Sequence, residues 1–202
     1  MPQSPATGGQ RRTAAETREH VLVVARDLFY WRGIHAVGVD TIAAEAGVAP
    51  TTLYRLFGSK DGLVGAYVER EADNHRQWFE RALGDPDRSA QERLICLFDA
   101  LTQLVAPEIC RGCPFQMVLA ETPRADRGAH RAAVEVKLWV HGRLRKLAAE
   151  HLGSDELGDP QADRLADQLM LIFEGAFATA ASIGADGPPS KLGRIASELL
   201  RR

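Results

Sequence analysis

The segment GVAPTTLYRLFGSK, residues 47–60, brings hydroxyl, phenol and guanidinium groups close together on a short stretch of chain. Its apolar residues have the spacing of a short helix that packs through one face, and they are Leu53, Leu56 and Phe57. The polar residues then lie on the outer face and its flank, and they are Thr51, Thr52, Tyr54 and Arg55. Threonine and arginine can contact base edges, and a tyrosine hydroxyl can reach a phosphate. This face therefore has the chemistry of a nucleic-acid contact, although an ordinary solvated helix face would show the same periodicity.

A candidate for anion binding follows at Lys60. Ser59 is a favoured N-cap residue, so a new helix is expected to begin at about Lys60. The free amides and the dipole at a helix N-terminus favour an anion. Lys60 therefore stands where a phosphate would be held.

Three short helices are expected to position these side chains. Apolar residues recur at three- and four-residue spacing over residues 14–32 and 39–46, and Gly33 and Gly47 end these two segments. The third helix begins near Pro50, which is tolerated in a first helical turn. Short helices joined by a tight turn that contains glycine are typical of a helix-turn-helix unit, in which the third helix enters the major groove of DNA.

The rest of the chain also has helical periodicity, with turn residues between the segments. The expected helices cover residues 60–83, 89–105 with a capping box at its start, 115–121, 124–151, 161–183 and 190–202. The sequence contains no strand alternation of useful length and no internal repeat. The fold is therefore predicted to be all-α.

The bulk composition is that of an ordinary globular protein. The 202 residues are 45% hydrophobic and 26% charged, and no run approaches the roughly 18 apolar residues of a membrane helix. The first residues lack an apolar stretch after their charges, so residues 1–12 are expected to form a flexible tail rather than a signal peptide. The protein is therefore expected to be cytoplasmic, with no membrane partner. The formal net charge is −2, divided as +2 over residues 1–60 and −4 over the remainder, which favours the N-terminal part as the anion-facing end.

Cys110 and Cys113 form a C-x-x-C pair, which can bind zinc or act as a redox switch. Zinc needs four ligands, and the sequence offers no second pair at suitable spacing, so no metal is expected. Arg111 could lower the pKa of a neighbouring thiol, which keeps the redox alternative open. The simpler interpretation is that Cys113 is a small buried residue at the start of the next helix. Three cysteines in a chain of this size also fit a reducing compartment.

The stretch DTIAAEAGVAPTTLYRLFGSKDGLV, residues 40–64, resembles the DNA-binding signature of the TetR (tetracycline repressor) family of bacterial regulators. The shared pattern is a helix that ends in A-x-x-A-G-V, a recognition helix with L-Y-x-x-F, and then a small residue, S-K and an acid. The resemblance covers about residues 14–65. The DNA contacts that it implies are Thr41, Pro50, Thr51, Thr52, Tyr54, Arg55 and Lys60.

Within that set the resemblance assigns particular roles. It places Thr41 at the start of the supporting helix and makes Lys60 a phosphate anchor. Two positions depart from the family pattern. Pro50 stands where the family often has a polar or basic residue, and Gly38 stands where a serine or threonine often touches phosphate.

The resemblance also implies how the whole chain is organised. Residues 13–60 would form the helix-turn-helix domain, and residues 61–202 a helical domain that binds a small effector and pairs with a second copy. The expected function is that of a homodimeric repressor, released from a palindromic operator by its effector. One short recognition helix contacts only a few base pairs, so two-fold pairing supplies the second half-site. Residues 165–184 fit a paired helix, because they are apolar nearly all round and rich in alanine.

Apolar side chains of the middle helices could line an effector cavity, and equally they could be ordinary core residues. They are Phe98, Leu101, Phe115, Met117, Trp139, Phe173 and Phe177. Gln116, His141 and Arg143 could add polar contacts. Their spacing does not select a chemical class of effector.

Other classes of function find less support. The sequence has no phosphate-binding loop, dinucleotide fingerprint, nucleophile elbow or H-E-x-x-H zinc motif, and its six histidines are scattered. We therefore expect no enzymatic activity and no cofactor. A helical adaptor that uses the same fold for protein contacts alone is the remaining alternative.

Overall fold

The described residues form helices that match the predicted segments closely. The structure, a computed structural model, describes residues 12–106, 110–122, 128–154, 158–184 and 186–201. The helices are α1 (Ala14–Arg32), α2 (Val39–Glu45), α3 (Pro50–Phe57), α4 (Lys60–Ala82), α5 (Ala90–Leu104), α6 (Pro114–Glu121), α7 (Gly128–Leu152), α8 (Pro160–Ile183), the 3₁₀ helix η1 (Pro188–Lys191) and α9 (Leu192–Leu200). These ranges contain no strand, and the predicted all-α fold is confirmed. None of the described helices combines the length and the apolar character needed to cross a membrane.

Side-chain caps fix several helix starts at the residues that the sequence indicates. Ser59 Oγ accepts a hydrogen bond of 3.0 Å from the Gly62 amide at the start of α4. Ser89 and Glu92 form the predicted capping box of α5. Thr13 opens α1 with a second capping box. These caps satisfy amides that have no partner within their own helix.

The chain after α8 differs from the prediction. Ser190 does not begin the last α-helix, because it lies in η1, and α9 follows. Two consecutive prolines open this segment, and a single 3₁₀ turn accommodates them because amides are not needed in a first turn. The predicted helix start at Arg124 lies outside the described residues, as do residues 1–11 of the predicted tail.

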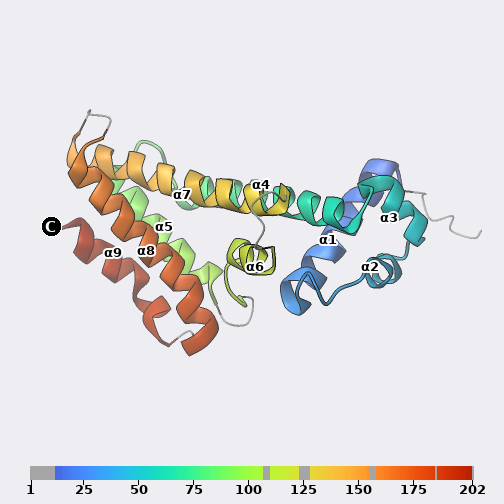
Figure 1. The fold of residues 1–202 in the computed structure, drawn as a ribbon. Helices are drawn as coiled ribbons and strands as arrows, with labels where there is room; N and C mark the ends of the chain where they lie inside the picture. Colours follow the sequence, from blue (N-terminus) through green and yellow to red (C-terminus); the bar gives the residue numbers. More distant parts are fainter. Residues whose placement is uncertain (1–11, 107–109, 123–127, 155–157, 185, 202) are drawn as a thin grey trace, which may run out of the picture.

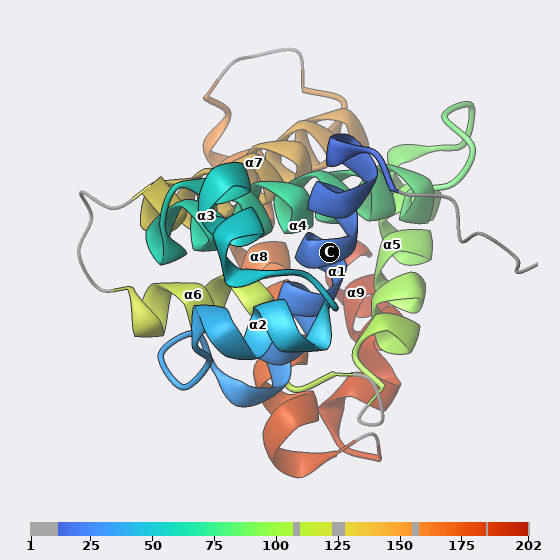
Figure 2. The same ribbon diagram turned by 90° about the vertical axis from the view of Figure 1, so that its right-hand side faces the viewer.

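The helices are distributed along the length of the molecule. α1, α2 and α3 lie together at one end, and α8 and α9 lie towards the opposite end (Figure 1). α4 and α7 run alongside each other between the two ends. Viewed from the first end, α2 and α3 face the viewer (Figure 2). α4 therefore connects the outward-facing pair of short helices to the larger part of the molecule.

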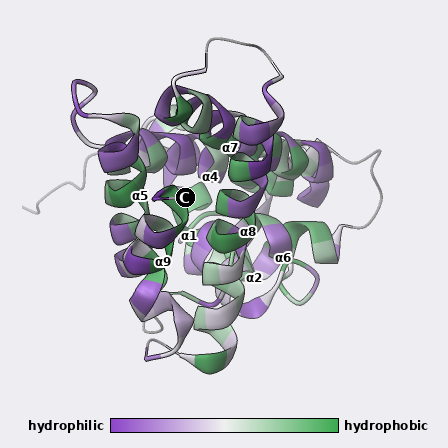
Figure 3. Ribbon diagram, turned by 90° about the vertical axis from the view of Figure 1, so that its left-hand side faces the viewer, coloured by the Kyte–Doolittle hydropathy of each residue, from purple (hydrophilic) through white to green (hydrophobic). Residues whose placement is uncertain are grey.

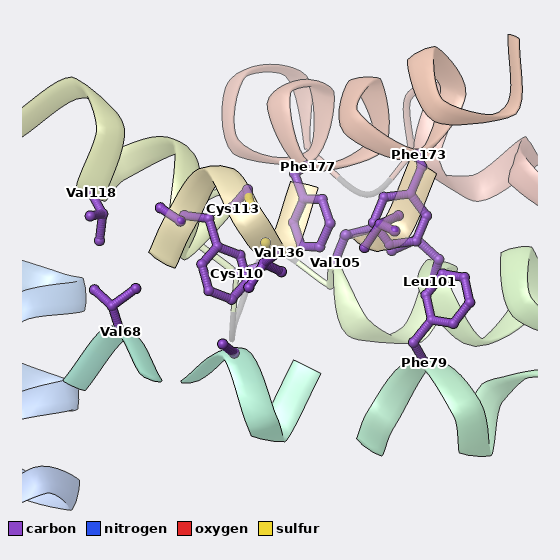
Figure 4. Close-up of a cluster of buried hydrophobic side chains, with 14 of the residues drawn as sticks. Val68, Phe79, Leu101, Val105, Cys110, Cys113, Val118, Val136, Phe173 and Phe177 are labelled. Atoms are coloured by element: carbon purple, nitrogen blue, oxygen red, sulfur yellow. The ribbon is translucent and has the colours of Figure 1, made fainter. Parts of the chain in front are cut away.

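Large apolar side chains from several helices meet in the core of the larger part. Phe79 of α4, Leu101 of α5 and Phe173 of α8 lie close together (Figure 4) and are fully buried. The ring centroids of Phe79 and Phe173 are 6.1 Å apart. Burial of each such side chain stabilises the fold by about 1.5–3 kcal/mol. The helices change between hydrophobic and hydrophilic residues along their length (Figure 3), as expected when one face of each helix is buried.

Candidate nucleic-acid interface and effector cavity

α3 is held to its neighbours through its predicted inner face. Leu53 is 2% exposed and belongs to the main hydrophobic core. Leu56 and Phe57 are half-buried. The Arg18 guanidinium of α1 lies 5.3 Å from the centroid of the Phe57 ring, close enough for a cation–π contact. α3 is therefore positioned by contacts on one side only.

The other side of α3 carries most of the predicted contact residues. Thr51 and Arg55 are exposed, and Tyr54 is 54% exposed. Pro50, the first residue of α3, is also exposed. Thr52 is only half-buried rather than fully outward, because it lies one helical turn before Leu56 and shares its flank. Three polar side chains and a proline thus form the open face of the helix.

α2 supports α3 and is tied to α1. The His20 imidazole donates from Nε2 to the Ala46 carbonyl oxygen at 3.1 Å, at the end of α2. α2 begins at Val39, and Gly38 as its N-cap provides no side-chain hydrogen bond. Thr41 lies in the first turn of the helix, as its third residue, and it is exposed.

The start of α4 approaches the end of α3 closely. A Cβ atom on Gly62 would collide with the carbonyl oxygen of Phe57, so this position requires glycine. Lys60 is the first residue of α4, as predicted, and it is half-buried. It lines a small cavity together with His35 and Thr122. Only part of the Lys60 side chain is therefore open to solvent.

A cavity of about 490 Å³ lies between α1, α4, α6, α8 and the end of α5. This volume is within the ~300–1,000 Å³ range of small-molecule sites. The apolar and aromatic part of its lining includes His75, Trp78, Leu104, Cys110, Phe115 and Phe177. α1 and α4 also contribute polar and charged residues to the wall, and they are Arg26, Asp27, Tyr30, Arg70, Glu71, Asn74, Gln77 and Arg81.

Only some of the predicted effector residues reach this cavity. Phe115 and Phe177 line it, and both are themselves buried, at 2% and 5% exposure. Three others are fully buried and do not line it, and they are Phe98, Leu101 and Phe173. Trp139 packs edge-on against Phe79, with centroids 5.3 Å apart. Met117 lines a small gap between α1 and α6.

The sequence patterns did not single out His75, Trp78 or Leu104 as cavity residues. His75 and Trp78 are three residues apart on α4, so they share a face of that helix. This pair of aromatic residues within the predicted helix is the sequence feature that could have indicated an aromatic cavity wall. The packing of α6 and α8 against α4 decides which face of α4 lines a cavity. The spacing of residues within α4 alone does not predict this packing.

The three polar candidates bond to acidic side chains and do not line the cavity. The pairs are Gln116 with Glu174 at 3.2 Å, His141 with Asp167 at 2.8 Å, and Arg143 with Glu80 at 2.7 Å. Each of these pairs joins two different helices, so these side chains hold the helices together.

Both cysteines of the C-x-x-C pair are buried free thiols. Cys113 is the N-cap residue of α6, which agrees with the simpler interpretation of the pair. Lys137 Nζ donates to Cys113 Sγ at 3.0 Å. Burial nevertheless raises the pKa of the Cys113 thiol, and the Lys137 charge opposes this only in part. Among the described residues, no three side chains of metal-binding type come together.

α6 is fastened to the end of α1 at one side and to the connection between α1 and α2 at the other. Before α6, Arg111 Nη1 donates to the Tyr30 and Trp31 carbonyl oxygens at 2.9 and 2.8 Å. At the end of α6, Glu121 Oε2 accepts from the His35 amide at 2.8 Å, and the Glu121 carbonyl oxygen accepts from the His35 imidazole at 2.6 Å. A movement of α6 would therefore reach the residues that lead from α1 to α2.

Comparison with known sequences gives matches in the N-terminal part. Residues 21–67 match the family described as bacterial regulatory proteins, tetR family. The chain is similar to the HTH-type transcriptional activator FasR of Mycolicibacterium smegmatis, with 42% identity over 73 residues, which are 35% of this chain and 33% of FasR. It is also similar to an HTH-type transcriptional regulator of Staphylococcus aureus, with 33% identity over 63 residues, which are 31% of this chain and 34% of that protein. The similar stretch thus spans about a third of the length of these relatives.

Similarity to solved structures extends over nearly the whole chain. A TetR-family transcriptional regulator from Streptomyces coelicolor has a TM-score of 0.83 and 28% identity, covering 93% of this chain and 95% of that one. A TetR transcriptional regulator from Streptomyces avermitilis has a TM-score of 0.76 and 30% identity, covering 92% and 96%. These similar proteins are transcriptional regulators rather than enzymes.

Proposed function

The chain belongs to the TetR family of bacterial transcriptional regulators, and from this premise we propose that it is a homodimeric repressor that leaves its palindromic operator when a small molecule enters the cavity. Residues 13–60 would form the DNA-binding domain, and residues 61–202 the effector-binding and dimerisation domain. α4 would serve both, because its first turns pack on α1, with the rings of Phe29 and Tyr67 5.5 Å apart.

The observation that carries the DNA-binding part is the exposed polar face of α3. Arg55 would bind a guanine through two hydrogen bonds, and Thr51 would contact a neighbouring base. Tyr54 and Lys60 would contact phosphates, which position the protein without selecting a sequence. The complete proposed contact set is Thr41, Pro50, Thr51, Thr52, Tyr54, Arg55 and Lys60.

The proposed dimer face is formed by α7 and α8. Polar pairs cross between these helices at successive levels, and they are Lys137–Glu174, His141–Asp167 and Arg145–Asp163. The residue number rises on α7 as it falls on α8, so the helices are antiparallel and Leu138 lies at the level of Leu171. These two side chains are 66% and 73% exposed. A second copy related by two-fold symmetry would cover them.

Release from DNA would act through α4 and α6. Both helices line the cavity. α4 also packs on α1 and α3, and it carries both Lys60 and the cavity residues His75 and Trp78. Arg111, just before α6, bonds to the end of α1, and Glu121 of α6 bonds to His35 in the connection from α1 to α2. A ligand that displaced either helix would change the separation of the two α3 helices in the dimer. Simultaneous fit to both half-sites would then be lost, and operator affinity would fall.

The test uses the purified full chain and DNA from upstream of its own gene. We expect footprints on two half-sites of one palindrome, separated by about one helical turn or a multiple of it. In a reporter strain, removal of the gene should raise expression from that promoter. Failure to bind any palindromic site at low salt would refute the proposal. Lower expression on removal would identify an activator, as FasR is, in place of a repressor.

A further inference from the structure

The aromatic part of the cavity is arranged around His75. Its ring lies 5.6 Å from the Trp78 ring with an interplanar angle of 33°, and 5.4 Å from the Phe115 ring at 77°. Phe173 of α8, a core residue outside the cavity lining, packs against another side of the His75 ring at 6.0 Å. Aromatic rings from α4, α6 and α8 thus line the cavity, since Phe177 of α8 lines it as well. Such surfaces favour a planar aromatic ligand, which can stack on one ring and meet another edge to face.

The His75 imidazole has no hydrogen-bond partner among the described residues. Each of the other histidines bonds to an oxygen atom, and they are His20, His35, His130, His141 and His151. Burial, assisted by the charges of Lys137 and Arg76, lowers the pKa of His75 to about 4. The ring is therefore neutral at pH 7 and offers one N–H donor and one acceptor nitrogen. A ligand that filled the cavity without bonding to this ring would leave a buried polar group unpaired, which is costly.

Most of the charged side chains in the cavity wall form ion pairs with neighbouring residues. The pairs are Arg70 with Glu19 at 2.6 Å and Glu71 at 3.3 Å, and Arg26 with Asp27 at 2.8 Å. Arg81, the other cation of the lining, is exposed to solvent. Of the described charged residues in the lining, all except the solvent-exposed Arg81 are therefore neutralised by an ion pair. An ionised group on a ligand would lose its hydration there without gaining a buried counter-ion.

We infer that the effector is an uncharged, planar aromatic molecule with a hydroxyl group, which packs against Trp78 and Phe115 and hydrogen-bonds to His75. This rests on the proposed function in one respect, namely that the ligand of this cavity is the effector. The rings supply affinity for the aromatic body, and the neutral imidazole selects the hydroxyl group. A site built to bond a hydroxyl group discriminates against an analogue that lacks it, because the imidazole is then left unpaired.

The test compares three probes of similar size by calorimetry on the full chain. The probes are 2-naphthol, naphthalene, which lacks the hydroxyl group, and decahydro-2-naphthol, which lacks the aromatic rings. We expect 2-naphthol to bind about tenfold more tightly than either of the others, because one hydrogen bond or one ring contact contributes roughly that factor. Equal affinity for 2-naphthol and either other probe, or no binding of 2-naphthol, would overturn the inference.

Substitution of the imidazole locates the hydrogen bond. His75→Phe keeps an aromatic ring at this position of the cavity and removes both ring nitrogens. The affinity for 2-naphthol should therefore fall about tenfold, while the affinity for naphthalene should be unchanged. His151→Phe is the matched control, because His151 bonds to the Leu200 carbonyl oxygen at the far end of α7. An unchanged preference for 2-naphthol in His75→Phe would overturn the assignment. The comparison of probes on the unmodified chain remains decisive if that variant does not fold.

Operator binding, measured in parallel by fluorescence anisotropy, separates this inference from the proposed function. Binding of 2-naphthol through His75 without any change in operator affinity would refute release by the cavity ligand and leave the ligand class intact. Release by a compound of another class, with no binding of 2-naphthol, would refute the ligand class and leave the repressor mechanism intact. We expect 2-naphthol both to bind and to weaken the operator complex.

Discussion

Arg55 and Lys60 are five residues apart, and their surroundings predict different contributions to DNA binding. Arg55 is exposed on the open face of α3, whereas Lys60 is half-buried at the start of α4. We expect Arg55→Ala to weaken binding to the preferred operator by about 1–3 kcal/mol and to relax the preference at one base pair. Lys60→Ala should weaken all sequences alike and reduce the salt slope by about 1.

Anisotropy titrations on the operator and on single-base variants, each at several salt concentrations, measure both effects. Arg194→Ala is the control, because Arg194 is an exposed arginine on α9, away from the helix-turn-helix unit. The assigned roles would be contradicted if the Arg55 and Lys60 variants behaved identically.

His75 also predicts how stability depends on pH. Burial lowers its folded-state pKa from 6.5 to about 4. Between these values the unfolded chain binds the additional proton, so the free energy of unfolding should rise with pH from 4 to 6.5 and become independent of this group above that range. The contribution lost on acidification is about 3 kcal/mol. Urea unfolding of the unmodified chain and of His75→Phe at several pH values measures this contribution. The prediction would be contradicted if the free energies of unfolding of the two proteins changed equally with pH.

At the scale of elements, the junction between α3 and α4 depends on one glycine. A Cβ atom at Gly62 would meet the Phe57 carbonyl oxygen, whereas one at Gly65, on the same helix, would meet nothing within 4 Å. We expect Gly62→Ala to destabilise the protein by about 1–3 kcal/mol through overpacking and to weaken operator binding by displacing α3. Gly65→Ala should stabilise it by about 0.5–1 kcal/mol, because alanine favours the helix. Chemical unfolding of both variants measures the difference in stability. Equal effects would show that the contact between position 62 and the Phe57 carbonyl oxygen does not require glycine.

The attachment of α6 to α1 predicts a variant that binds ligand and no longer responds to it. Arg111→Ala removes the hydrogen bonds to the Tyr30 and Trp31 carbonyl oxygens. Ligand affinity and operator affinity measured separately should change little, while the factor by which the ligand weakens operator binding should fall towards one. Coupling factors of this kind are typically about 5- to 150-fold, so the loss is measurable. Full coupling in Arg111→Ala would show that the signal passes through α4 alone.

At the scale of the whole molecule, Leu138 and Leu171 decide whether the chain forms the proposed dimer. Each leucine that a partner buries contributes about 1.5–3 kcal/mol. Leu138→Lys together with Leu171→Lys should therefore raise the dimer dissociation constant on the order of a hundredfold or more. Operator binding should weaken with it, because each monomer reads only one half-site. Light scattering measures the mass, and Leu152→Lys, at the exposed end of α7, is the control. A dimer of unchanged stability would place the interface elsewhere.

The sequence by itself determined the helices, their order and the face that α3 exposes. Helix periodicity, caps such as Ser59 and Ser89, and glycines such as Gly33 are local signals, since they arise from residues within a few positions of one another. The TetR signature is likewise made of residues close together in sequence, so it is visible in the sequence of the helix-turn-helix unit. Thr52 was predicted to face outward with Thr51 and Arg55, and it is half-buried because it shares a flank of α3 with Leu56.

Only the tertiary structure decided which side chains surround the cavity. Phe98, Leu101, Phe115, Phe173 and Phe177 have similar helical spacing and are all buried, yet of these five only Phe115 and Phe177 line the cavity. His75 lines it as well, and it is the histidine without a hydrogen-bond partner among the described residues. These outcomes depend on where α4, α6 and α8 lie relative to one another. A cavity is a property of several helices that are distant in sequence, so no pattern within one of them can specify it.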